Sequence, residues 1–274
     1  MLIGYNTNGF AFHRLDDAIQ IIADLGYQCV AITVDQHALN PYDDIAAHVE
    51  KARARLNALG LSSVIETGAR FLLDPRRKHH PTLLDRRGAG RERRMDFLKR
   101  CVDIAEGLGS LAVSFWSGAL APGQRERAAF DLLSKACAEL SDYAAGRGVV
   151  LAFEPEPGMF VDTLAKYDRL AEAVGRDNFR LTIDVGHLQC NEADAPGDLI
   201  RRYAPRLANA HLDDMCRGAH DHLFFGEGEV DFGPVFAALK AAEYDGPACV
   251  ELSRHSHNAV DIAERAKQFL DRFG

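Results

Sequence analysis

Short apolar runs that end abruptly in one acid or histidine recur four times in the second half of the chain, and they constrain the fold more than any other feature. The first run, residues 149–153, leads into Glu154 and is followed by Pro155 and Pro157. An apolar run without polar alternation is typical of a strand packed on both faces, and proline cannot donate to a ladder, so we place Glu154 at the C-terminal end of a buried strand. The four run ends are, in order, Glu154, Asp184, His211 and Glu251.

Apolar runs and segments of helical periodicity alternate along all 274 residues. The expected strands are residues 2–5, 29–34, 63–65, 111–115, 149–153, 179–183, 207–210 and 248–250. The expected helices are residues 15–25, 43–59, 92–107, 125–145, 164–174, 198–203, 234–242 and 259–273. This order predicts an α/β protein with a single (β/α)8 TIM barrel over residues 1–274, whose site lies at the C-terminal ends of the strands. Two longer stretches, residues 69–90 and 213–233, are expected to be irregular.

The composition, with 47% hydrophobic and 26% charged residues, is that of a globular protein. No run approaches the ~20 apolar residues of a membrane span, and the N-terminus does not resemble a signal peptide, so we expect no membrane association and a cytoplasmic location. The six cysteines have no C-x-x-C spacing, which predicts reduced thiols. A net charge of −8 argues against a nucleic-acid partner.

One segment departs from this acidic average. Residues 76–100 contain ten Lys or Arg against three Asp or Glu. Two interpretations remain open: a solvated helix face or interface, and a positive patch that attracts an anionic substrate. If the irregular stretch 69–90 closed over the site, its residues Lys78, His79 and His80 would favour a substrate with a phosphate or a carboxylate.

The four run ends have the residue types and the spacing of a metal site. The successive gaps between the four residues are 30, 27 and 40 residues, and each matches about one strand–helix unit. The last gap is longer because it contains the irregular stretch 213–233. Neighbouring barrel strands end on one ring, so the four side chains should converge. Three carboxylates and one imidazole favour Mn²⁺, Mg²⁺ or Co²⁺, with Zn²⁺ as a further option. The alternative is a set of solvated strand-end acids and a core histidine.

Several short motifs resemble those of a known superfamily. They are Phe153-Glu154-Pro155, Asp184-Val-Gly-His187, His211-Leu-Asp-Asp214, His220-Asp-His222 followed by Phe225-Gly-Glu-Gly228, and Val250-Glu251-Leu252. In combination, and over essentially the whole chain, they are similar to the xylose isomerase-like TIM-barrel superfamily. That superfamily joins sugar and sugar phosphate isomerases and epimerases to the endonuclease IV type of apurinic-site endonuclease. The resemblance implies that the four run ends are metal ligands shared by the superfamily. Because its members are often dimers or tetramers, the resemblance also makes a homo-oligomer possible for this chain.

The endonucleases of this superfamily hold three zinc ions, whose sites can be compared with this sequence. The histidines that hold one zinc after the third and fourth strands have no counterpart in residues 67–71 or 115–118. The resemblance therefore implies that this zinc site is absent. Another zinc site corresponds to His187, His220 and His222. These imidazoles would either hold a second metal or, as in the isomerases, form hydrogen bonds with the substrate.

The leading prediction is a metal-dependent isomerase or epimerase of a sugar, a sugar phosphate or a polyol. The metal would polarise a substrate carbonyl, and Glu154 and Glu251 would form the acid–base pair, because glutamates are long enough to reach both the metal and the substrate carbon. The expected substrate contacts are Glu156, Arg217 and Trp116, with Phe12 as a further pocket wall. The arginine is suggested by the resemblance, and each of these residues has a plain structural role as its alternative.

Two other activities remain open. A dehydratase (lyase) acting on an inosose or a dehydroshikimate-like acid would begin with the same proton abstraction. An endonuclease IV-like phosphodiesterase would use His187, His220 and His222 together with the basic segment. The missing histidines and the acidic remainder of the chain disfavour the phosphodiesterase, since binding to a phosphate backbone requires extended positive charge. The expected partner is therefore a small sugar-like molecule.

Overall fold

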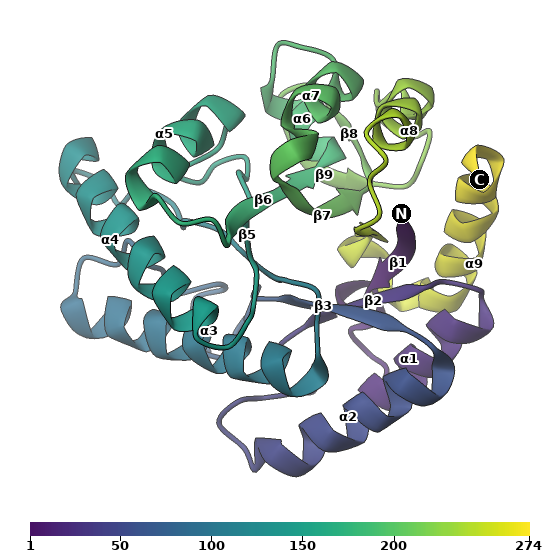
Figure 1. The fold of residues 1–274 in the computed structure, drawn as a ribbon, viewed down its shortest axis with the longest axis horizontal. Helices are drawn as coiled ribbons and strands as arrows, with labels where there is room; N and C mark the ends of the chain where they lie inside the picture. The colour runs from purple at the N-terminus through teal and green to yellow at the C-terminus, as the bar shows by residue number, and fades with distance from the viewer.

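The computed structural model describes residues 1–274 and contains a closed barrel of eight parallel strands surrounded by helices (Figure 1). The barrel strands are β1 (Leu2–Asn6), β2 (Cys29–Thr33), β3 (Ser62–Glu66), β4 (Val113–Phe115), β5 (Leu151–Phe153), β6 (Phe179–Asp184), β7 (Leu207–Leu212) and β10 (Pro247–Val250). Around the barrel the order is β1, β10, β7, β6, β5, β4, β3 and β2, so β10 closes the barrel against β1. The predicted single (β/α)8 TIM barrel is confirmed.

The helices alternate with the strands and cover the outside of the barrel. They are α1 (Leu15–Asp24), α2 (Ile45–Leu59), α3 (Gly88–Leu108), α4 (Glu126–Ala145), α5 (Leu164–Val174), α6 (Val185–Asn191), α7 (Pro196–Tyr203), α8 (Phe232–Ala241) and α9 (Ala259–Leu270). Short 3₁₀ turns occupy Thr7–Phe10, Ala204–Arg206, Ser253–Asn258 and Asp271–Phe273. Gly60 ends α2 in the left-handed conformation with φ 65°, which favours glycine at that position.

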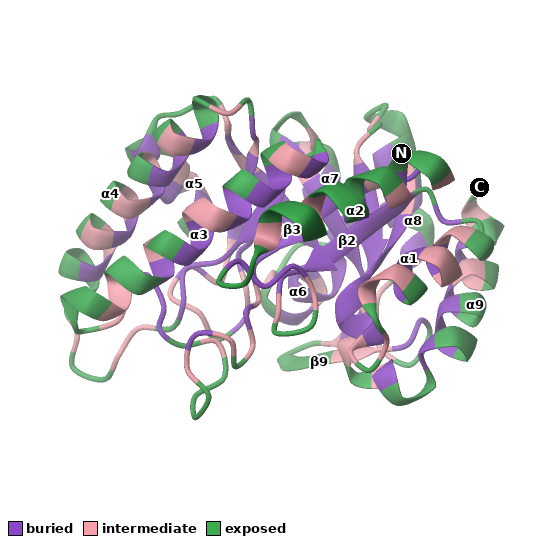
Figure 2. Ribbon diagram, turned by 90° about the horizontal axis from the view of Figure 1, so that it is seen from below, coloured by how far each residue is buried: buried purple, intermediate pink, exposed green.

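The strands are buried because both of their faces are covered. Every residue of β2 is buried, and 66 buried residues of the chain form one hydrophobic cluster. In Figure 2 the buried strands lie in the middle of the molecule, and exposed residues line the outer faces of the helices. Packing against β1 is tight: a Cβ at Gly4 would lie 2.5 Å from Cys249 Sγ and 2.7 Å from the carbonyl oxygen of Cys29. This close packing explains why the strand sequences are apolar without alternation.

The structure adds two elements to those expected from the sequence. Helix α6 follows β6 without a loop, because the Asp184 side chain caps it by accepting a hydrogen bond from the backbone N–H of His187 at 2.8 Å. Strands β8 (Asp214–Cys216) and β9 (Ala219–Leu223) form an antiparallel hairpin within the stretch 213–233. These elements are too short for a periodic pattern to be visible in the sequence.

The basic segment contains a solvated majority and one buried residue. Its exposed members are Arg76, Arg77, Lys78, Arg86, Arg87 and Arg93. Arg94 is 1% exposed, and its guanidinium donates to the carbonyl oxygen of Thr67 at 2.8 Å. The Arg94 Cζ atom lies 4.7 Å from the centre of the Trp116 ring. The interpretation of the basic segment as a solvated helix face is therefore wrong for Arg94, because an aromatic ring and a backbone carbonyl replace water around its guanidinium.

The six cysteines are free thiols, as their spacing predicts, and five of them are buried. None of the helices combines the length and the apolar composition needed to cross a bilayer.

Candidate metal centre

Four side chains from consecutive strands of the barrel meet at its C-terminal end, and we call them the quartet. Glu154 follows β5 directly, Asp184 is the last residue of β6, His211 lies in β7, and Glu251 follows β10. One ligand atom from each residue lies within 4.8 Å of the others. In the barrel these strands are neighbours in the order β10, β7, β6, β5, which holds their ends side by side. The structure thus brings together the four residues that the sequence indicated.

His211 lies at the centre of the quartet. Its Nδ1 is 2.8 Å from Glu251 Oε2, 3.1 Å from Glu154 Oε1 and 3.9 Å from Asp184 Oδ2. The Oδ2 atom of Asp184 is buried and has no hydrogen-bond partner. Burying several ionised carboxylates side by side costs free energy unless a positive charge compensates them. This donor set therefore fits a divalent cation.

The protonation states of the quartet reflect this crowding. Burial raises the pKa of Glu154 to about 7, despite the opposing effect of His211. Burial also disfavours the ionised form of Glu251, but His211 outweighs that effect and lowers the pKa of Glu251. For His211, burial is outweighed by the surrounding glutamates, Glu66 foremost, which raise its pKa well above the usual range. Without a metal, a protonated imidazole therefore supplies the positive charge that a cation would otherwise bring.

Three residues that were not predicted from the sequence form hydrogen bonds with members of the quartet. The side-chain amide of Asn8 donates to Glu251 Oε1 at 2.7 Å. Glu66 and Asn209, both buried, contact the other side of the His211 ring. Glu66 could have been recognised in the sequence, because it ends an apolar run as the quartet residues do. No sequence pattern indicates the two asparagines.

His187, His220 and His222 form a second cluster, which we call the triad. His187 lies in α6, and the other two lie in β9. The Nε2 atoms of His187 and His220 are 3.1 Å apart, and one ring nitrogen from each histidine lies within 4.8 Å of the others. Asp213, a buried acid that the sequence analysis did not propose, contacts His222 Nδ1 through Oδ2 at 2.6 Å and accepts from the backbone N–H of Gly186 at 3.2 Å. A Cβ at Gly186 would collide with Asp213, so α6 requires a glycine there.

The three imidazoles of the triad differ in protonation. Burial lowers the pKa of His187 to about 4, and the partial desolvation of the His220 ring, followed by the charge of His222, lowers the pKa of His220. Burial opposes a charge on His222 as well, but Asp213 outweighs it and raises the pKa of His222 to about 10. At neutral pH the triad therefore presents two neutral rings and one imidazolium.

Three quartet residues, Glu154, His211 and Glu251, and the whole triad line one cavity of about 300 Å³. Trp116 is the single hydrophobic residue among the 21 that line it. Glu156 also lines the cavity, and burial together with the charge of Glu154 raises the pKa of Glu156 to about 8. Lys78 and His79 reach the same cavity from the stretch before α3. Such a lining suits a small molecule that carries many polar groups.

Two of the expected pocket residues lie elsewhere. Arg217 is absent from the lining of the cavity, and its exposed guanidinium donates to the carbonyl oxygen of Glu192 at 2.5 Å. Phe12 is 80% exposed and lines a separate cavity. Both residues lie in turns, where no periodic pattern in the sequence indicates the direction of a side chain.

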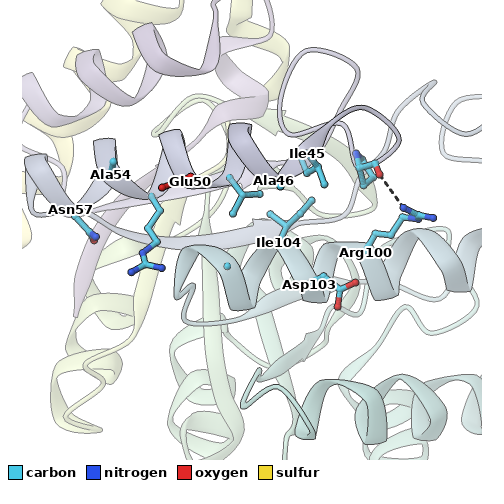
Figure 3. A pocket seen from close by; sticks show the side chains of 12 residues that line it. Ile45, Ala46, Glu50, Ala54, Asn57, Arg100, Asp103 and Ile104 are labelled. Atoms are coloured by element: carbon cyan, nitrogen blue, oxygen red, sulfur yellow. Dashed lines mark hydrogen bonds between the residues drawn. The ribbon is translucent and has the colours of Figure 1, made fainter.

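A larger cavity of about 690 Å³ lies between α2 and α3, on the outside of the barrel (Figure 3). Ile45 and Ala46 of α2 face Ile104 of α3 there. At one end Arg100 donates to the carbonyl oxygen of Pro41 at 3.2 Å. No residue of the quartet or the triad lines this cavity, so its size does not mark it as the site of chemistry.

Solved structures of other proteins share this fold. The D-allulose 3-epimerase of Methylomonas sp. has a TM-score of 0.80 at 20% identity, covering 100% of this chain and 98% of that chain. The probable 3-DHS dehydratase AsbF of Bacillus anthracis has a TM-score of 0.79 at 17% identity, covering 99% of each chain. At these identities the similarity is one of fold.

The amino-acid sequence is similar to those of curated relatives and to a family profile. The inosose dehydratase of Lacticaseibacillus casei is 29% identical over 161 residues, which are 52% of this chain and 54% of the relative. The chain thus spans about half the length of the curated relatives that it matches. Residues 19–273 match the sequence profile of the xylose isomerase-like TIM barrel, a range that includes the quartet and the triad. The chain therefore belongs to the xylose isomerase-like TIM-barrel family.

Proposed function

We propose that the protein is a metal-dependent epimerase or isomerase of a small polyhydroxylated ketone, such as a sugar or a sugar derivative. The observation that carries this proposal is the placement of Glu154 and Glu251 around one point of a polar cavity of about 300 Å³. Both carboxylates approach His211 Nδ1, yet they follow β5 and β10, which are separated by β6 and β7 in the barrel. They therefore reach that point from different sides.

The quartet is the proposed cation site. Its three carboxylates, its imidazole nitrogen and the unpartnered Asp184 Oδ2 are the donors that Mn²⁺, Mg²⁺ or Co²⁺ would take, with Zn²⁺ as a further option. When bound, the ion would supply Lewis-acid polarisation of a substrate carbonyl. The four quartet side chains would hold it from one side of the cavity.

Glu154 and Glu251 are the proposed acid–base pair. One carboxylate removes the proton from the carbon beside the carbonyl, and the other returns a proton to the opposite face, which inverts that carbon. The return of a proton to the neighbouring carbon gives the isomer instead. A pKa of about 7 suits Glu154 to exchange protons near neutral pH, and the ionised Glu251 is suited to act first as the base.

The triad and Glu156 are placed to bind substrate hydroxyl groups. The imidazolium of His222 keeps one N–H to donate besides the one on Asp213, and the neutral rings of His187 and His220, which share one hydrogen bond between their Nε2 atoms, add one donor and one acceptor between them. With its raised pKa, Glu156 is a carboxylic acid at neutral pH and donates as well. Trp116 adds one apolar wall. This combination of donors and acceptors supports a polyhydroxylated substrate.

Isotope exchange and turnover test the proposal. The Mn²⁺-loaded protein is incubated in D₂O with D-allulose and a panel of other keto sugars, and NMR measures deuterium at the carbon beside the carbonyl. Wild type should incorporate deuterium and interconvert the two epimers, whereas neither Glu154→Gln nor Glu251→Gln should interconvert them. Phe12→Ala changes an exposed side chain outside the cavity and should match wild type. Wild-type turnover in both glutamine variants would refute the assignment of the pair.

A dehydratase is the second candidate, and the similarity to inosose dehydratases favours it. The same glutamates would serve: one would remove a proton, and the other would protonate the departing hydroxyl group. Incubation with an inosose or with 3-dehydroshikimate separates the two activities. A product that has lost one water, detected by mass spectrometry, would support the dehydratase, and a product of unchanged mass would support the epimerase.

The phosphodiesterase alternative would use the triad, but two other histidines that it requires are missing from the sequence. The two positions where the resemblance to the endonucleases would require histidines are Gly68 and Trp116, and the imidazole beside them, His79, is held by the carbonyl oxygen of Gly68 at 2.6 Å. Cleavage of a duplex that contains an abasic site is the measurement that would revive this alternative.

A further inference from the structure

We infer that Glu66 is a positioning residue, which fixes the ring of His211 so that Nδ1 faces the proposed cation with a free lone pair. The inference rests on the proposed metal centre and adds to it a residue outside the quartet. Glu66 is the last residue of β3, lines the cavity and is 6% exposed. Its ion-pair partner is His211, so this buried acid has no other charge to satisfy.

The contact crosses the interior of the barrel. In the closed order of strands, β3 and β7 are separated by three strands in either direction, so Glu66 and His211 start from opposite walls. Glu66 Oε1 nevertheless lies 2.9 Å from His211 Nε2. The same oxygen accepts from the side-chain amide of Asn209 at 3.1 Å. His211 is therefore held on its Nε2 side by Glu66, while Nδ1 points to the acids of the quartet.

Without a cation both ring nitrogens of His211 face carboxylates and both carry a proton, but with a cation among the quartet acids the contacts of Nε2 would favour one tautomer. The Nδ2 atom of Asn209 lies 3.1 Å from His211 Nε2, and an amide nitrogen can only donate, whereas a carboxylate can only accept. If Nε2 carries the proton, both nitrogens donate to Glu66 Oε1, and Nδ1 keeps a lone pair for a metal. If Nε2 lacked the proton, its lone pair would face a carboxylate oxygen at 2.9 Å, which is repulsive. Glu66 thus favours the tautomer that a metal at Nδ1 requires.

Replacement of Glu66 by glutamine should disturb this selection without changing the size of the side chain. The glutamine amide can turn its NH₂ group toward Nε2 and donate to it, which stabilises the tautomer with the proton on Nδ1. That proton would then occupy the position of the cation. Loss of a group that orients a ligand histidine typically weakens metal binding by about 10–100-fold.

Calorimetric titration of the full chain with Mn²⁺ tests the inference in wild type, Glu66→Gln and Ser63→Ala. Ser63 lies in the same strand as Glu66, but its hydroxyl hydrogen-bonds Ser110 Oγ at 2.7 Å and it does not line the cavity. The Ser63→Ala variant therefore controls for a general weakening of β3. We expect Glu66→Gln to bind Mn²⁺ about 10–100-fold more weakly than wild type, and Ser63→Ala to bind it equally well.

A second measurement reads the tautomer directly and does not depend on the folding of Glu66→Gln. In the Mg²⁺-loaded wild type, ¹H–¹⁵N NMR should find the ring proton of His211 on Nε2, with the signal assigned by its absence from His211→Gln. A proton on Nδ1 would overturn the inference, and so would equal Mn²⁺ affinity in wild type and Glu66→Gln. A wild type that binds no Mn²⁺ would overturn the metal centre itself and this inference with it, which is a distinguishable result.

Discussion

The triad and all quartet residues except Asp184 line the same cavity, but the two clusters are built on different kinds of structure. The quartet stands at the ends of four consecutive barrel strands, each paired on both sides, and three of its members are buried. The triad combines the short helix α6 with the hairpin strand β9, which pairs only with β8 and lies at the lower edge of the barrel in Figure 2. His187 is buried, His220 is exposed and His222 is intermediate. The comparison shows that the barrel itself places the quartet, whereas added elements place the triad.

The two clusters also carry opposite charge. The quartet has three acids around one imidazole, and its buried Asp184 Oδ2 lacks a partner. The triad has no carboxylate among its members, and Asp213 behind it keeps His222 protonated. A cation should therefore prefer the quartet, and substrate oxygens should prefer the triad. The following predictions test that division of roles.

The largest effect is expected from the quartet. Glu251→Gln removes one member of the proposed acid–base pair and should lower kcat by about 10²–10⁴-fold, the usual contribution of a general base. Steady-state kinetics on the substrate found by the sugar panel measures it, with circular dichroism to confirm folding. An equal loss in His220→Gln would show that the two clusters do not divide the chemistry in this way.

Metal binding should stabilise the fold through the quartet alone. Mn²⁺ at about a hundredfold excess over its Kd should raise the free energy of unfolding by about 2.7 kcal/mol. Asp184→Asn should lose this gain while its Oδ1 still caps α6, and His187→Gln should retain the gain. Chemical denaturation with and without Mn²⁺ measures the difference. Equal stabilisation of wild type and Asp184→Asn would place the ion elsewhere.

A second ion at the triad should bind more tightly as the pH rises. Ligation by all three imidazoles requires the proton of His222 to leave, and the pKa of that ring is raised to about 10. Between pH 7 and pH 10 the affinity should therefore increase by up to about tenfold per pH unit, since each unit raises the deprotonated fraction tenfold. Metal analysis after equilibrium dialysis at pH 7 and pH 9 measures it. Two ions per chain with equal affinity at pH 7 would contradict the prediction.

The smallest effect is expected from a single member of the triad. His220→Gln keeps hydrogen-bonding capacity but changes its position, and the loss of one substrate hydrogen bond is worth about 1 kcal/mol, or roughly fivefold in kcat/KM. The loss should appear mainly in KM, because binding rather than proton transfer is affected. Unchanged kinetics would remove His220 from the substrate site.

Most of the fold and the quartet could be predicted because their signals are local. Each barrel strand is a short apolar run, and each quartet residue directly ends such a run or stands within its last residues, as His211 does in β7. Element α6 and the β8–β9 hairpin escaped prediction because they are too short to show a period. Arg217 was expected at the substrate but lies in a turn and contacts Glu192 instead.

The sequence by itself determined the barrel and the identity of the four residues at its strand ends, because burial and periodicity are written along the chain. Only the tertiary structure decided that Nδ1 of His211 faces the quartet acids and that Nε2 faces Glu66. Glu66 and His211 are 145 residues apart and meet only because the barrel closes and sets β3 opposite β7. The direction of a side chain depends on the packing of such distant neighbours, and no pattern along the chain specifies it.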